Sequence, residues 1–114
     1  MNNDCSNTNP EASHLPGQQY SPSFCAQRLK VLADLNRFTI LRLLLDGPKH
    51  VWELNRELSL EQSLLSHHLK ILRQEGLVQS QRDGKAVLYC LAPGVRINSG
   101  KGINLECCVL SFDC

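Results

Sequence analysis

The pattern of apolar and polar residues predicts four helices followed by two short strands. Apolar residues recur at helical spacing in four segments, separated by capping and helix-breaking residues. These helices are predicted over residues 24–35, 37–46, 51–58 and 62–75. Asn36 is the predicted N-cap of the second helix, which Gly47 and Pro48 end. The strands are predicted over residues 77–81 and 86–91, and Asp83-Gly84 between them is a typical hairpin turn.

The fourth predicted helix has one apolar face and one polar face. Leu65, Leu69 and Leu72 follow one another at i, i+4 and i+7, so they are expected to pack against the second and third helices. The opposite face carries short hydrogen-bonding side chains and a cation, which suit base edges and phosphates. The residues of this face are Gln62, Ser63, Ser66, His67 and Lys70. Arg82 and Lys85 flank the hairpin tip, where they are expected to reach the DNA backbone.

Two helices joined by a short turn and followed by a hairpin predict a winged helix-turn-helix. The expected fold class is therefore mainly α with a β-hairpin wing (α+β), and the DNA-binding domain covers residues 22–94. Residues 1–21 contain too few apolar residues to offset the entropy of ordering, and they are predicted to form a flexible arm. In residues 95–114 the periodicity fades, and Gly100 and Gly102 argue against one long helix.

Composition and charge limit the classes of function. The chain has 114 residues, enough for one domain. It has no apolar run near the ~20 residues of a membrane span, and residues 1–21 contain no apolar signal core, so a cytoplasmic location without membrane contact is expected. Residues 28–85 contain ten Lys/Arg and seven Asp/Glu, a balance of +3 that permits nucleic-acid binding. No nucleophile–base pair or phosphate loop is present, so neither an enzyme nor an organic cofactor is predicted.

Six cysteines without an export signal are expected to be thiols for metal or redox chemistry rather than a disulfide framework. Cys107 and Cys108 are adjacent, and their α-carbons are about 3.8 Å apart, below the roughly 4.4–6.8 Å usual for a disulfide. Two free thiols are therefore expected there, and Cys114 follows six residues later. Cys25 and Cys90 are expected to pack as small apolar residues, whereas the role of Cys5 is open.

The number of C-terminal thiols bears on the ion that they would bind. Soft thiolates select soft ions, and structural zinc takes four ligands in a tetrahedron. Trivalent arsenic and antimony take three sulfurs in a pyramid, because a lone pair occupies the fourth direction. Cys107, Cys108 and Cys114 therefore predict a site for trivalent arsenic (arsenite) or antimony(III). A cadmium, lead or other soft-metal site and thiols without a metal function are the alternatives.

Two stretches of the chain resemble the arsenic-responsive ArsR/SmtB family of bacterial metal-sensing repressors. They are LKVLADLNRFTILRLLLDG and LSLEQSLLSHHLKILRQEGLVQSQRDGKAVLYCLAP, and the pattern S-x-H-L-K-x-L-x-x-x-G-L-V covers residues 66–78. The resemblance implies a homodimer on palindromic operator DNA, whose affinity falls when a ligand binds. It also assigns DNA contacts to the residues of the polar helix face and the hairpin tip. The segment ECCVLSFDC is similar to the C-terminal thiols of some arsenic sensors in this family.

The sequence departs from the family pattern at several positions. Many arsenic sensors carry Cys-x-Cys where this chain has His50-Val51-Trp52, and Trp52 is expected to pack instead. His67 stands where many relatives have Arg, and no histidine follows His68 to form the C-terminal zinc site. A zinc role for the adjacent pair His67 and His68 is a minor alternative.

A dimer surface is expected where apolar residues have no other explanation. Its candidates are the first helix and the C-terminal residues Ile103, Leu105, Val109, Leu110 and Phe112. Binding of an ion beside this surface would repack it and change the distance between the two recognition helices. The alternative functions are a thiol-redox-responsive repressor of the same fold and a small metal-buffering protein.

Overall fold

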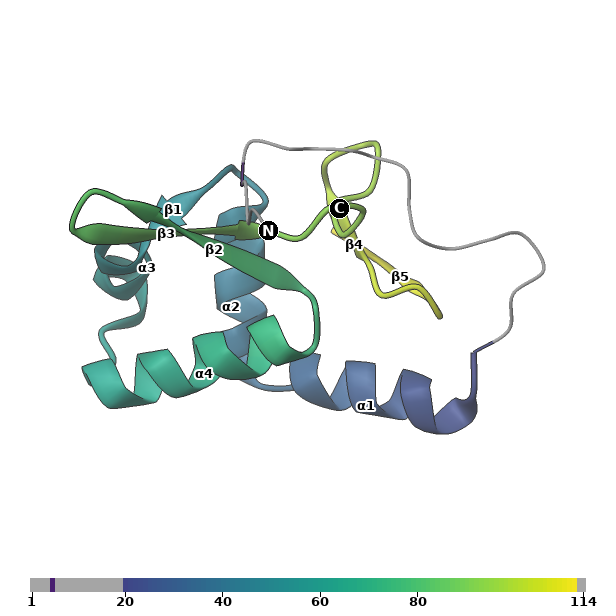
Figure 1. The fold of residues 1–114 in the computed structure, drawn as a ribbon. Coiled ribbons are helices and arrows are strands. Elements are labelled where there is room, and N and C mark those ends of the chain that lie inside the picture. The colour runs from purple at the N-terminus through teal and green to yellow at the C-terminus, as the bar shows by residue number, and fades with distance from the viewer. Residues whose placement is uncertain (1–4, 6–19, 113–114) are drawn as a thin grey trace.

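The computed structural model describes Cys5 and residues 20–112, which form four helices and five strands (Figure 1). The helices are α1 (Pro22–Leu32), α2 (Leu35–Leu44), α3 (Val51–Leu58) and α4 (Gln62–Gln74). The strands are β1 (Lys49–His50), β2 (Val78–Asp83), β3 (Ala86–Leu91), β4 (Gly102–Asn104) and β5 (Val109–Ser111). The predicted flexible arm, apart from Cys5, Tyr20 and Ser21, lies outside the described residues, as does Cys114. No helix in the described part of the chain is long and apolar enough to cross a membrane.

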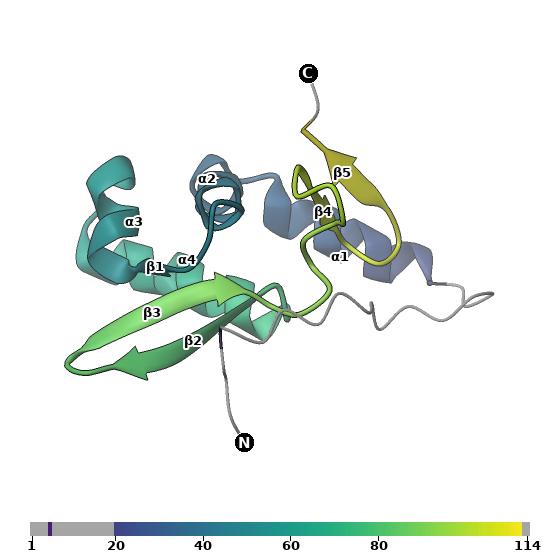
Figure 2. The ribbon, with the colours of Figure 1, turned by 90° about the horizontal axis from the view of Figure 1, so that it is seen from above.

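The core is built around α2, which lies between α3 and the β4–β5 hairpin (Figures 1 and 2). Its Ile40, Leu41 and Leu44 are completely buried. Leu65, Leu69 and Leu72 of α4 are at most 2% exposed, so this stripe is buried as its spacing predicts. The other fully buried side chains are Leu54, Leu77, Val78, Ile103 and Leu105.

Helix α2 begins two residues earlier than predicted. The N-cap is Asp34, whose side chain accepts a hydrogen bond from the Arg37 N–H at 3.1 Å, so the assignment of Asn36 as cap is wrong. Both residue types cap helices well, because both carry an oxygen close to the backbone. The carboxylate of Asp34 occupies the capping position, and Asn36 lies inside the helix.

The wing belongs to a three-stranded antiparallel sheet in the order β1-β3-β2. β2 and β3 pair from Val78↔Leu91 to Asp83↔Ala86, so the turn between them consists of Gly84 and Lys85. Gly84 takes a φ of 65°, which a glycine adopts without strain. The short strand β1 was not expected, since its two residues are too few to give a periodic signal.

The C-terminal residues form a second hairpin, β4–β5, whose apolar side chains extend the core. Arg96 ties this part of the chain to α2 by donating to the Leu44 carbonyl at 2.9 Å. Ile103 and Leu105 are completely buried within the chain, so their assignment to a dimer surface is wrong. Val109, in contrast, is 55% exposed. These residues reach the core because the chain folds back over α2, which periodicity within one segment does not reveal.

Cys5 and Cys90 form a disulfide, so the expectation that all six cysteines are thiols is wrong for this pair. Their α-carbons are 5.7 Å apart, within the usual range for such a bond. Cys5 is 7% exposed, and its backbone N–H donates to Oε1 of Gln81 on β2 at 2.7 Å. The bond therefore attaches a residue from the start of the chain to the wing sheet.

Removal of this disulfide is expected to destabilise the domain. The bond closes a loop with a sequence separation of 85 residues, and bonds of this kind typically contribute about 2–4 kcal/mol by restricting the unfolded chain. The Cys5→Ser variant should lose about this much free energy of unfolding in urea denaturation. Dithiothreitol should destabilise the unsubstituted protein to a similar extent and leave the stability of the variant unchanged. Equal stability of the reduced and oxidised unsubstituted protein would contradict the Cys5–Cys90 disulfide.

Candidate functional site

The turn between α3 and α4 is held by one asparagine side chain. Asn55 donates from Nδ2 to the Leu60 carbonyl at 3.0 Å, and its Oδ1 accepts from the Leu60 N–H at 2.8 Å. Ser59, at the end of α3, takes a left-handed conformation with a φ of 55°. Together these features fix the angle between the two helices, and hence the direction in which α4 presents its polar face.

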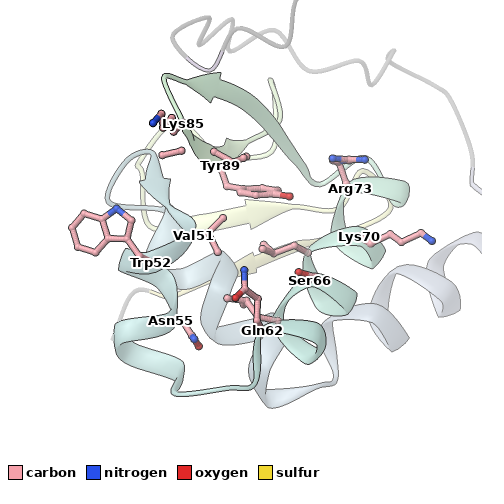
Figure 3. A pocket seen from close by; sticks show the side chains of 13 residues that line it. Val51, Trp52, Asn55, Gln62, Ser66, Lys70, Arg73, Lys85 and Tyr89 are labelled. Atoms are coloured by element: carbon pink, nitrogen blue, oxygen red, sulfur yellow. The ribbon is translucent and has the colours of Figure 1, made fainter.

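A hollow of about 710 Å³ lies between α3, α4 and the wing; we call it the α3–α4–wing hollow (Figure 3). Its lining residues are Val51, Trp52, Asn55, Gln62, Leu65, Ser66, Leu69, Lys70, Arg73, Lys85, Ala86, Val87 and Tyr89. Three of the thirteen, Lys70, Arg73 and Lys85, are cationic, and none is acidic. The hollow is therefore a positively charged surface with amide and hydroxyl groups, a combination suited to a nucleic-acid backbone.

All seven residues predicted to contact DNA are exposed, but they do not all line this hollow. Gln62, Ser66 and Lys70 line it from α4, and Lys85 lines it from the hairpin tip. Ser63, His67 and Arg82 are exposed outside it. The structure thus brings four of the seven around one concave surface, and the contact roles of all seven stay predictions.

Sequence reasoning missed Arg73, which adds a third cation to the hollow. Arg73 follows Lys70 by three residues and Ser66 by seven, so helical spacing alone places it on the same side of α4. Its Nη1 donates to the hydroxyl of Ser80 on β2 at 3.3 Å, which links the end of α4 to the wing. Asn55 and Tyr89 were also missed, because they come from elements whose proximity to α4 no local pattern shows.

Trp52, which was expected to be a packing residue, lies at the edge of the hollow and is 58% exposed, so it packs against surface side chains and not in the core. The Arg56 guanidinium lies over its ring, 5.3 Å from the centroid. The His50 ring stacks against it with centroids 6.0 Å apart. The indole therefore offers an aromatic surface at the edge of the hollow opposite Lys70 and Arg73.

His67 and His68 point to different surroundings, because only His68 is on the buried side of α4. His68 is 5% exposed, and its Nδ1 lies 3.2 Å from Nη1 of Arg37. Burial lowers the pKa of His68, although the nearby Asp34 carboxylate opposes this effect. A neutral His68 that accepts a hydrogen bond from Arg37 is a structural residue, and His67 alone belongs to the exposed face.

The second candidate site is the turn that joins β4 to β5, where the two adjacent thiols lie. The Leu105 N–H donates to the Cys108 carbonyl at 2.8 Å, and Glu106 takes a φ of 75°. Cys107 and Cys108 are free, as expected, and are half-buried, with their sulfur atoms 3.9 Å apart. Burial, followed by hydrogen bonding to Cys107, raises the pKa of the Cys108 thiol.

Cys25 on α1 lies beside the same pair, so the expectation that it is simply a packing residue is incomplete. Hydrogen bonding to the Cys107 thiol, and then burial, raises the pKa of Cys25 to about 11. Within Cys5 and residues 20–112, no three Cys, His, Asp or Glu side chains are already arranged to hold a metal ion. The thiols would therefore have to move together to share one.

Comparison with known proteins identifies the family. The family model described as "Bacterial regulatory protein, arsR family" matches residues 34–80. The chain is 38% identical over 74 residues to the HTH-type transcriptional regulator YgaV of Escherichia coli, a match that covers 64% of this chain and 75% of YgaV. The chain belongs to the arsR family.

Other relatives of this arsR-family protein agree with its winged fold. It is 44% identical over 64 residues to the transcriptional activator HlyU of Vibrio cholerae, a match that spans 56% of the chain but only 59% of HlyU. The structure of reduced HlyU superposes with a TM-score of 0.59 at 40% identity, covering 61% of this chain and 74% of that chain. A structure described as a possible transcriptional regulator for arsenical resistance gives a TM-score of 0.56 at 33% identity, covering 59% and 70%. The predicted winged helix-turn-helix is confirmed, and these relatives are regulators rather than enzymes.

In this arsR-family protein a histidine holds the wing to α3. His50 contacts Asp83, at the end of β2, with its Nε2 2.8 Å from Oδ2, and contacts Glu53 with its Nδ1 3.0 Å from Oε1. Hydrogen bonding to Asp83 and then to Glu53 raises the pKa of His50 above its ordinary value, since both partners favour the imidazolium. The protonated form therefore stabilises the wing, and this contribution is lost as the pH rises through the raised pKa.

Replacement of Asp83 should lower the pKa of His50. In the Asp83→Asn variant the first of the two carboxylate partners becomes neutral, so the imidazolium loses stabilisation. An NMR titration of the His50 ring protons should give a pKa above the ordinary value in the unsubstituted protein and a lower one in the variant. Glu57→Gln, which removes an exposed carboxylate from the same helix as Glu53, should not shift the His50 titration. Identical His50 titrations in the Asp83 variant and the unsubstituted protein would refute the contact.

Proposed function

We propose that this protein is a transcriptional repressor that binds double-stranded operator DNA as a homodimer and releases it when a trivalent metalloid binds its C-terminal thiols. The observation that carries the DNA-binding half is the α3–α4–wing hollow, which presents three cations and no acidic side chain. Membership of the arsR family supports the same conclusion.

The exposed face of α4 would enter the major groove, with the wing beside it. Gln62, Ser63, Ser66 and His67 occupy the first half of the helix, where the base edges lie in helix-turn-helix complexes. Lys70, Arg73, Arg82 and Lys85 would contact phosphates. In a homodimer the two α4 helices would occupy successive major grooves about 34 Å apart. Leu29 and Leu35 support such an assembly, since these large apolar residues are 45% and 79% exposed in the single chain.

The cations of the hollow should determine how strongly DNA binding depends on salt. Lys70→Ala is expected to weaken binding to any operator fragment by at least about tenfold, because one charged hydrogen bond is lost. It should also reduce the slope of log K against log salt by about 1. A gel-shift or anisotropy titration at several salt concentrations measures both effects. The matched control is Lys30→Ala, which removes an exposed cation from α1. Equal affinities and equal salt slopes for the two variants would contradict the proposal. A protein that retards no DNA fragment at all, as expected of a metal-buffering protein, would contradict it as well.

The inducer half of the proposal rests on the thiols of the C-terminal turn. Cys107 and Cys108 are free and half-buried, and Cys114, outside the described residues, is the third predicted ligand. The three sulfurs would suit trivalent arsenic, or antimony(III), better than a tetrahedral ion. The raised pKa of Cys108 disfavours the reactive thiolate that a redox sensor needs. The similarity to a structure described as a possible regulator for arsenical resistance supports the same ligand.

Release of DNA requires only a modest coupling between the two sites. A 100-fold loss of operator affinity corresponds to about 2.8 kcal/mol, which is within the usual range of allosteric coupling. Binding at the β4–β5 turn would repack the C-terminal hairpin against α2, which also carries the α3 and α4 contacts. The spacing of the two α4 helices in the dimer would then change.

Loss of one thiol should abolish the response to arsenite. A DNA-shift titration with arsenite should release the unsubstituted protein from its operator, whereas Cys107→Ser and Cys108→Ser should stay bound at the same concentration. The double variant Cys5→Ser, Cys90→Ser removes two cysteines that take no part in this site, and it should respond as the unsubstituted protein does. Release of both single variants at the original arsenite concentration would exclude the assigned site, and parallel titrations with antimonite, cadmium and zinc identify the preferred ion.

A further inference from the structure

One face of α1 lies against the turn that carries the two C-terminal thiols. Arg28 follows Cys25 by three residues, so the two side chains share a face of α1. The Arg28 guanidinium pairs with Glu106, with Nη2 and Oε1 3.6 Å apart, and Glu106 immediately precedes Cys107. Figures 1 and 2 show the β4–β5 hairpin above α1. The pairing therefore directs the Cys25 side of the helix toward the Cys107–Cys108 pair.

The three free thiols of the described residues lie at this contact, and a small movement would bring them around one ion. Cys25, Cys107 and Cys108 are each half-buried, and none takes part in a disulfide. The Cys107 and Cys108 sulfurs are 3.9 Å apart, and the Cys25 thiol interacts with Cys107. These thiols therefore come from a helix and from a turn 82 residues later in the chain.

We propose that Cys25 is a ligand of the inducer site, so that an ion bound by Cys25, Cys107 and Cys108 fastens α1 to the β4–β5 turn. This inference rests on the proposed function and specifies which sulfurs hold the metalloid. Cys25 lies on a formed helix beside the pair, so ligation through it orders little additional chain. Cys107 and Cys108 belong to both ligand sets, and Cys25 takes the third position, which the sequence prediction gives to Cys114.

The chemistry of three cysteine ligands fits arsenous acid. Each thiol proton leaves with one hydroxyl of As(OH)3 as water, so three As–O bonds break, three As–S bonds form and three water molecules are released. No electron is transferred, and neither an oxidant nor a reductant is needed. The exchange also conserves charge, so the arsenic with its three sulfur ligands carries no net charge.

The same face of α1 connects this site to the recognition helix. Arg28 Nη1 donates to the carbonyl of Glu75, the C-cap of α4, at 2.7 Å, and Gln27 donates to the Glu75 carboxylate at 3.0 Å. A shift of α1 toward the β4–β5 turn would therefore displace the C-terminal end of α4. Arg28, placed between Glu106 and Glu75, is a positioning residue in this connection.

The test compares Cys25→Ser with Cys114→Ser in the full-length chain. Arsenite binding is followed by sulfur-to-arsenic absorption in the near ultraviolet, and arsenic X-ray absorption counts the bound sulfurs. We expect three sulfurs in the unsubstituted protein and in Cys114→Ser, but two in Cys25→Ser. Loss of a residue that only hydrogen-bonds to a metal ligand typically lowers affinity by roughly 10–100-fold. The arsenite affinity of Cys25→Ser should fall by more than this, because a ligand itself is lost. Cys25→Ala replaces the serine variant if that variant does not fold. A measurement on the unsubstituted protein needs no variant: bound arsenite should protect Cys25 from alkylation.

Each outcome separates this inference from the proposed function. The role of Cys25 would be overturned if Cys25→Ser kept three sulfurs and its arsenite affinity while Cys114→Ser lost arsenite binding. This result would leave the proposed sensor function intact. Ligation by Cys25 in a protein that stays on its DNA would support the role of Cys25 and overturn the sensor. A chain that binds no arsenite would overturn both.

Discussion

The contact between the leucines of α4 and the core around α2 holds the polar face of α4 in place. Leu65, Leu69 and Leu72 are almost completely buried, and each such side chain contributes about 1.5–3 kcal/mol when it leaves water. Because this stripe fixes the rotation of α4, its polar side must face outward. The wing takes its position from the same core through Leu77 and Val78. The arrangement of the exposed residues is thus determined by the buried ones.

The parts of the structure that were predictable are those whose signal is local. Helix α3 begins at Val51 and ends at Leu58, and β3 covers residues 86–91, as the pattern of the chain predicts. The polar face of α4 was identified for the same reason, since helical spacing alone separates it from the leucines. Even locally, Asp34 and Asn36 are both good caps, and only the positions of the atoms decide between them.

The features that were not predictable are contacts between distant segments. The Cys5–Cys90 bond, the approach of Cys25 to Cys107 and the burial of Ile103 all join parts of the chain more than 50 residues apart. Periodicity describes which face of an element is apolar, but not which element covers it. Arg28 is a clear case: as a sequence feature it is an ordinary helix cation, yet it contacts both the end of α4 and the C-terminal turn.

The division of α4 into a buried stripe and an outward face has an evolutionary consequence. Gln62, Ser63, Ser66 and His67 make no contribution to the hydrophobic core, so they can be exchanged with little loss of stability. With these side chains as the proposed DNA contacts, duplicated copies of such a gene would be free to acquire new operator preferences while the scaffold stays the same. Diversification of targets in a lineage of these proteins would require few compensating substitutions.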